Sequence, residues 1–97
     1  MEEQLSFTLI DGTFDPAIAS PLISSLYQSK ILYHSQENLR QFEYFGKNSL
    51  IEEQRILVLE NARKQFNLKM TEAMNLDLDV LIKSNIEVTF INKESKA

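Results

Sequence analysis

The sequence predicts an α+β fold in the order strand, helix, helix, strand. Two long antiparallel helices form a hairpin, and the N- and C-terminal strands flank it and pair as an antiparallel sheet. Three observations predict this fold. Apolar and polar residues alternate near both ends of the chain, over 5–10 and 82–91, and apolar residues recur at helical spacing between them. Residues 45–52 combine the signals that end one helix and begin the next.

Composition bounds the class of protein. The 97 residues fit one domain, 1–97, and a hydrophobic fraction of 43% with only two Gly and two Pro is typical of a folded chain. The absence of Cys excludes disulfides and Cys-ligated zinc. A net charge of -4 opposes the counterion release that drives nucleic-acid binding, so we expect no nucleic-acid partner. With neither an export signal nor a membrane-spanning apolar run, a cytoplasmic protein without a membrane partner is expected.

The first strand is predicted over residues 5–10. Leu5, Phe7 and Leu9 would share one of its faces, because successive side chains in a strand point to opposite sides. The residues that follow, 11–13 (Asp-Gly-Thr), have the composition of a turn. The strand therefore leads directly toward the first helix.

The first helix is predicted to begin at Asp15 and Pro16, because Asp accepts from the free N–H groups and Pro suits the first helical position. Pro21 removes a backbone hydrogen bond further on, so we expect a kinked or two-stage start. Residues 30–33 are alternatively a short extended piece between two shorter helices. The predicted stripe of this helix is Leu22, Ile23, Leu26, Tyr27, Ile31, His34, Phe42 and Phe45.

The turn between the helices is the firmest local prediction. Gly46 suits the left-handed conformation that closes a helix, and Ser49 with Glu52 matches the S-x-x-E capping box that opens one. Each helix would span roughly 24 residues, or about 36 Å, so the two match in length and can pack antiparallel. The stripe of the second helix is Ile51, Val58, Leu59, Ala62, Phe66, Met70 and Ala73.

The second strand is predicted over residues 82–91, where Ile82, Ile86, Val88 and Phe90 fall on one face. Residues 76–79 either begin this strand or connect it to the second helix. A sheet of only two strands leaves both edges unpaired. We therefore expect a homodimer, in which the sheet extends to four strands or helices pack on helices.

Residues 12–16, Gly-Thr-Phe-Asp-Pro, resemble the phosphate-binding turn of the nucleotidyltransferase superfamily. The positions that this family fills with His are Ile18 and Pro21 here, so the groups that stabilise phosphate charge are absent. Residues 10–13 similarly resemble a phosphatase loop, but Leu9 occupies the position of its nucleophilic aspartate. We interpret the segment as a turn between strand and helix.

His34 is the only histidine, and Glu37 and Asn38 lie one helical turn away. One His and one Glu give two ligands at most, fewer than a metal site needs, so we predict neither a metal nor a cofactor. We interpret His34 as a partly buried or hydrogen-bonded helix residue, and predict no catalytic residue. The competing interpretation is a composite site across a dimer, formed by His34, Glu37 and tyrosines such as Tyr33.

Three aromatic residues lie next to Gly46: Phe42, Tyr44 and Phe45. Either this end of the hairpin binds a protein partner, or two of the rings pack against Leu50 and Ile51. We favour the packed arrangement, with Tyr44 covering the helix end.

A further resemblance spans most of the chain. Its landmarks are residues 11–14 (Asp-Gly-Thr-Phe), 29–31 (Ser-Lys-Ile) with His34, 45–46 (Phe-Gly) and 84–86 (Ser-Asn-Ile). They are similar to those of a family of short uncharacterised bacterial proteins. The resemblance implies no activity, ligand or residue role.

The function predicted from the sequence is that of a small cytoplasmic, non-enzymatic homodimer that acts as a protein-interaction module. The absence of a catalytic signature and the unpaired strand edges lead to it. The alternative is a small enzyme or ligand-binding protein with a composite site around His34 at the dimer interface.

Overall fold

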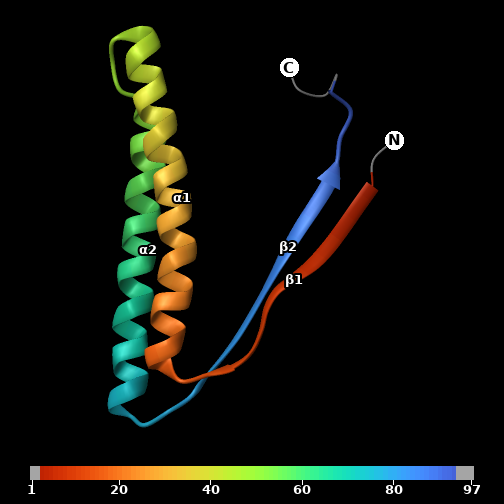
Figure 1. Ribbon diagram of the computed structural model, residues 1–97, viewed down its shortest axis with the longest axis vertical. Coiled ribbons are helices and arrows are strands. Elements are labelled where there is room, and N and C mark those ends of the chain that lie inside the picture. Colours follow the sequence, from red (N-terminus) through yellow and green to blue (C-terminus); the bar gives the residue numbers. More distant parts are fainter. Residues whose placement is uncertain (1–2, 94–97) are drawn as a thin grey trace.

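A computed structural model describes residues 3–93 and confirms the predicted order of elements (Figure 1). Its elements are β1 (Glu3–Phe14), α1 (Pro16–Phe45), α2 (Leu50–Asn75) and β2 (Val80–Phe90). β1 and β2 pair as an antiparallel ribbon, and α1 and α2 pack against each other as a hairpin. The ribbon leaves the base of the hairpin and diverges from it, so the two halves lie side by side as the arms of an open V.

α1 begins as the sequence predicts but does not break at Pro21. The Asp15 carboxylate accepts from Ala17 N at 2.8 Å, and Pro16 occupies the first turn. The helix then continues to Phe45, so both the two-stage start and the extended piece at 30–33 were wrong. Pro21 leaves only one carbonyl without its helical donor, that of Ala17, and Ala17 is exposed, where water can supply the missing bond.

The turn at the far end of the hairpin forms as predicted. Gly46 has a φ of 72°, and its N–H donates to Phe42 O. Ser49 caps α2 and accepts from Glu52 N at 3.3 Å. The helices contain 30 and 26 residues, longer than the predicted 24, and so measure about 45 and 39 Å. Within residues 3–93, neither helix combines the length and apolar character needed to cross a membrane.

The base of the hairpin closes in a Schellman motif. Leu78 N donates to Ala73 O at 2.9 Å and Asp77 N donates to Met74 O at 3.1 Å, with Asp77 left-handed at a φ of 55°. Residues 76–79 are therefore the connection, and β2 begins only at Val80.

A β-bulge gives the ribbon a single apolar face. The pairing Thr8↔Asn85 is followed by Ile10↔Ser84, so Leu9 is the extra residue of β1. If Leu9 instead took a regular place in the pairing, the apolar positions of β1 before and after it would lie on opposite faces. The predicted trio Leu5, Phe7 and Leu9 is corrected accordingly. The apolar residues that the pairing places on one face are Leu5, Phe7, Ile10 and Phe14 of β1 and Val80, Ile82, Ile86, Val88 and Phe90 of β2.

The buried seam between the helices is narrow. Among the described residues, the buried apolar side chains are Pro16, Ala19, Ile31, Met70 and Ala73, and no large side chain is fully buried. Leu22 and Leu26 of the predicted α1 stripe, like Ile51 and Val58 of the α2 stripe, remain exposed. The predicted stripes are thus wider than the surface that the opposite helix covers.

We predict that deleting Leu9 leaves the fold intact, because removing the extra residue restores regular pairing with every other side chain on its present face. Deleting Asn85 from the facing strand should instead move Ile86, Val88 and Phe90 to the polar face and abolish cooperative unfolding. Circular dichroism and thermal melts at equal protein concentration test this pair. Equal melting temperatures for the two deletions would contradict the role assigned to the bulge.

We predict that Gly46→Ala lowers the free energy of unfolding by about 1–2 kcal/mol, the cost of a left-handed L-residue. The new Cβ would meet no atom within 4 Å, so backbone strain alone is measured. Gly12→Ala is the control, because its Cβ would make ordinary contact with the Phe14 ring at 3.5 Å. It should be neutral or stabilise by up to about 1 kcal/mol. Denaturant titrations would contradict the prediction if both variants matched the wild type.

Candidate functional site

The most buried polar side chain among the described residues is His34, in the seam between the helices. Its exposed fraction is 4%, and its Nδ1 lies 2.5 Å from Glu52 Oε2 on α2. Since a carboxylate only accepts, the ring N–H at Nδ1 donates to Glu52 and fixes the orientation of the imidazole. His34 was interpreted as a partly buried or hydrogen-bonded helix residue. The hydrogen bond is present, and the side chain is buried rather than partly buried.

The capping box at the start of α2 is rearranged, and this leaves the Glu52 carboxylate able to bind His34. In the usual box, Glu52 would reach back to Ser49 N, but here Asn38 Oδ1 of α1 accepts from Ser49 N at 2.7 Å. The Glu52 carboxylate is thereby free to turn to His34. Two polar contacts between α1 and α2, Asn38–Ser49 and His34–Glu52, thus join the helices near the turn.

Glu37 and Tyr33, the other residues predicted to form a site with His34, make no hydrogen bond to its imidazole among the contacts of the described residues. Glu37 pairs with Arg40 one turn further along α1 and not with His34. Tyr33 meets the His34 ring edge to face at a centroid distance of 5.2 Å, and Lys30 Nζ lies 6.0 Å from the centroid of the Tyr33 ring. Within one chain the carboxylate that meets the His34 imidazole is therefore that of Glu52 and not that of Glu37. The composite site across a dimer stays a prediction.

A hollow of about 510 Å³ opens beside His34 on the ribbon side of the hairpin. Lys30 and Arg55 supply two positive charges to its walls, and a neighbouring hollow that shares Lys30 and Leu59 reaches Ile10 and Ser84 of the ribbon. No Ser, Thr or Cys lines the hollow of about 510 Å³, so it offers no hydroxyl or thiol nucleophile beside the Glu-oriented histidine. It suits an apolar group that carries negative charge. Its lining residues are Lys30, His34, Ile51, Gln54, Arg55, Val58 and Leu59.

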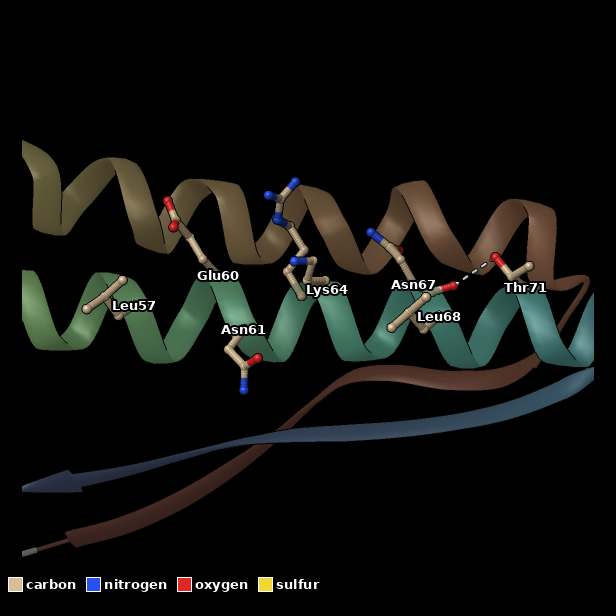
Figure 2. Close-up of a pocket in the computed structure, with 8 residues that line it drawn as sticks. Leu57, Glu60, Asn61, Lys64, Asn67, Leu68 and Thr71 are labelled. Atoms are coloured by element: carbon tan, nitrogen blue, oxygen red, sulfur yellow. Dashed lines mark hydrogen bonds between the residues drawn. The ribbon is translucent and has the colours of Figure 1, made fainter.

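A second hollow, of about 530 Å³, runs along another side of α2 (Figure 2). Figure 2 shows Glu60, Lys64 and Asn67 on the side of α2 nearer to α1, with Thr71 Oγ1 donating to Asn67 O at 3.1 Å. The Asn67 side chain in turn accepts from Ser20 and Ser24 of α1. Opposite charges alternate with amides here, which is typical of a solvated helix surface.

The three aromatic residues at the turn are exposed. Tyr44 has an exposed fraction of 78%, and its ring lies 6.3 Å from that of Phe45. Phe42 and Phe45 are exposed as well, and so are Leu50 and Ile51, against which we expected them to pack. The packed arrangement was therefore wrong, and the structure leaves an apolar, solvent-facing turn.

Sequence reasoning missed Glu52, Lys30 and Arg55. Glu52 was assigned to the capping box, and no local signal shows that Asn38 replaces it there. The spacing of Ile51, Arg55 and Val58 at i, i+4 and i+7 does place them on one side of α2. That signal was available, but only the helix crossing brings Lys30 to the same hollow.

Comparison with known proteins assigns no residue a role. The chain matches no protein-family model, and searches of curated proteins and of solved structures found no match to it. The resemblance to short bacterial proteins stays a prediction. In residues 3–93, no three His, Cys, Asp or Glu side chains are grouped so that they could hold a metal ion.

We predict that Glu52→Ala destabilises the protein by about 1–3 kcal/mol more than Glu53→Ala. Both changes remove one negative charge from the first turn of α2, but only the first leaves a buried imidazole N–H without an acceptor. Urea unfolding at a fixed protein concentration measures the difference. Equal midpoints would show that the His34–Glu52 pair contributes nothing beyond the helix dipole.

Proposed function

We propose that this protein is a non-enzymatic module that works through association, folding as a homodimer and presenting a surface to other proteins. The single observation that carries the proposal is the amount of apolar surface that one copy leaves uncovered. Two further observations support it: the strand edges of the ribbon are unpaired within the described part of the chain, and the hollow beside His34 is better suited to binding than to catalysis.

One copy exposes far more surface than a compact monomer of its size. A monomer of 11.2 kDa has an accessible surface of about 5,700 Å² by the usual scaling with mass, whereas this chain has 7897 Å². The excess is about 2,200 Å². If each of two copies buried that area, the interface would total about 4,400 Å², within the range of obligate homodimers.

The uncovered surface is apolar. Large hydrophobic side chains on all four elements are exposed, among them Phe7, Tyr33, Val58 and Phe90. A soluble monomer does not normally expose apolar patches of this extent, because each costs free energy in water. A partner that covers them would remove that cost.

The edges of the ribbon support the same proposal. Within residues 3–93, β1 and β2 pair only with each other, so each strand presents one edge that pairs with no other strand of the described chain. Pairing with the same edge of a second copy would give a four-stranded antiparallel sheet, the extension that the sequence suggested. Backbone hydrogen bonds between the two edge strands would then fix how the strands of the two copies are aligned in an otherwise apolar interface.

The enzymatic alternative has less support. His34 is oriented by Glu52, as a general base would be, but no Ser, Thr or Cys lines the hollow beside it, and residues 3–93 contain no group of three side chains that could hold a metal ion. The charged groups at that hollow, Lys30 and Arg55, instead suit binding. We also propose a cytoplasmic location, with which a chain without cysteine is compatible.

We predict that sedimentation equilibrium gives twice the chain mass of 11.2 kDa at tens of micromolar. The melting temperature should rise with protein concentration, because dissociation and unfolding are coupled when the single copy lacks a core. A monomeric mass that is unchanged by dilution, with a concentration-independent melting temperature, would refute the proposal.

A further inference from the structure

The two connections between ribbon and hairpin are short and ordered. A single residue, Asp15, separates β1 from α1; its side chain caps the helix and its carbonyl accepts from Ile18 N and Ala19 N at 2.9 Å. The Schellman motif around Asp77 orders the start of the other connection. Little free chain is therefore left at either connection for the ribbon to fold down onto its own hairpin.

The two arms of the V therefore keep apolar surfaces open within one copy. The ribbon has two parts, one on each side of the bulge at Leu9. The part farther from the hairpin presents a surface that we name the distal ribbon face: Leu5, Phe7, Ile86, Val88 and Phe90. On the hairpin, the two hollows on the ribbon side define a surface that we name the hairpin patch: Leu26, Lys30, Ile51, Arg55 and Val58. Phe7, Phe90 and Val58 are exposed by 53%, 53% and 68% in the single chain.

Resting on the proposed homodimer, we infer that the distal ribbon face of each copy packs on the hairpin patch of the other copy, beside the buried His34–Glu52 pair. The contact is made twice, because a two-fold axis relates the copies and each contributes one surface of each kind. Such a reciprocal contact places both kinds of apolar surface in the interface, whereas pairing of strand edges alone would leave the hairpin patch in water.

Charge complementarity favours the partner's distal ribbon face as the surface that covers the hairpin patch. The charged residues of the two strands beyond the bulge are Glu3 and Glu87. Glu3 is paired with Phe90 at the end of the apolar face, whereas Glu87 is paired with Ser6 on the polar face, so the negative charge at the apolar face is that of Glu3. The hairpin patch has the opposite sign, with Lys30 and Arg55 around its aliphatic side chains. An acidic, apolar ribbon end thus meets a basic, apolar hollow, the chemistry to which that hollow is suited.

The ribbon and the hairpin are similar in length, as this contact requires. The ribbon strands contain 12 and 11 residues and so extend about 36–40 Å, close to the 39 Å of α2. A ribbon that approaches from the partner can therefore reach along the hairpin as far as the residues beside His34.

Two neighbouring residues of α2 provide a matched test. Val58 belongs to the hairpin patch, while Leu57, exposed by 65%, lines the polar hollow of Figure 2 on another side of the helix. In an isolated chain, Val58→Asp and Leu57→Asp would be equally harmless. At the inferred interface, Val58→Asp buries an unpaired carboxylate, and we expect its dimer dissociation constant to rise at least about tenfold while that of Leu57→Asp stays close to wild type.

A photocrosslink tests the same contact without depending on a destabilising variant. Benzoylphenylalanine at Phe90, on the distal ribbon face, should join two chains, with the crosslink mapped by mass spectrometry to residues 51–58 of the partner in mixtures of ¹⁴N and ¹⁵N protein. The same group at Thr89, on the polar face, should not.

The outcomes separate the two proposals. A wild-type monomer would refute the homodimer itself. A dimer that Leu57→Asp weakens and Val58→Asp does not, or whose Phe90 crosslinks stay within one chain or reach another surface, would overturn only the inferred contact. Loss of dimer in Val58→Asp together with interchain crosslinks to 51–58 supports it.

Discussion

A single layer of two helices and two strands cannot enclose a core, and the rest of this structure follows from that constraint. The Cα trace measures 49 × 38 × 14 Å, so its shortest dimension is little more than the diameter of one helix with its side chains. Each element can hide one narrow side against its neighbour. Large apolar residues on other sides stay exposed in the single chain, and this exposure is the physical reason for the association that we propose.

Local chemistry explains why so much of the fold could be predicted from the sequence. Asp15 with Pro16, Gly46, and Ser49 each act within a few residues of themselves, and all three formed as expected. Pro21 was misjudged because its cost depends on its surroundings. One lost hydrogen bond in an exposed early turn is small beside the bonds of a 30-residue helix.

The candidate site could not be predicted in the same way, because it is formed by contacts between elements, and the periodicity of apolar residues does not indicate such contacts. Leu9 continues the alternation of β1 in sequence, yet the bulge is placed there because β2 alternates without interruption and dictates which β1 residues share its apolar face. Glu52 likewise has a complete local explanation as half of a capping box. Only the approach of Asn38 from the other helix takes over that role and releases the carboxylate.

The His34–Glu52 pair then does more than join two helices. Apolar side chains in the seam, such as Ile31 and Met70, do not by themselves select one register of α1 against α2, because apolar contacts are not directional. A buried imidazole N–H has an acceptor in only one register, and any shift would leave it unpaired at a cost of about 1–3 kcal/mol. The same register brings Lys30 of α1 beside Arg55 of α2. A polar contact inside one hairpin thereby sets the position of the basic, apolar surface at which we propose that a second copy binds.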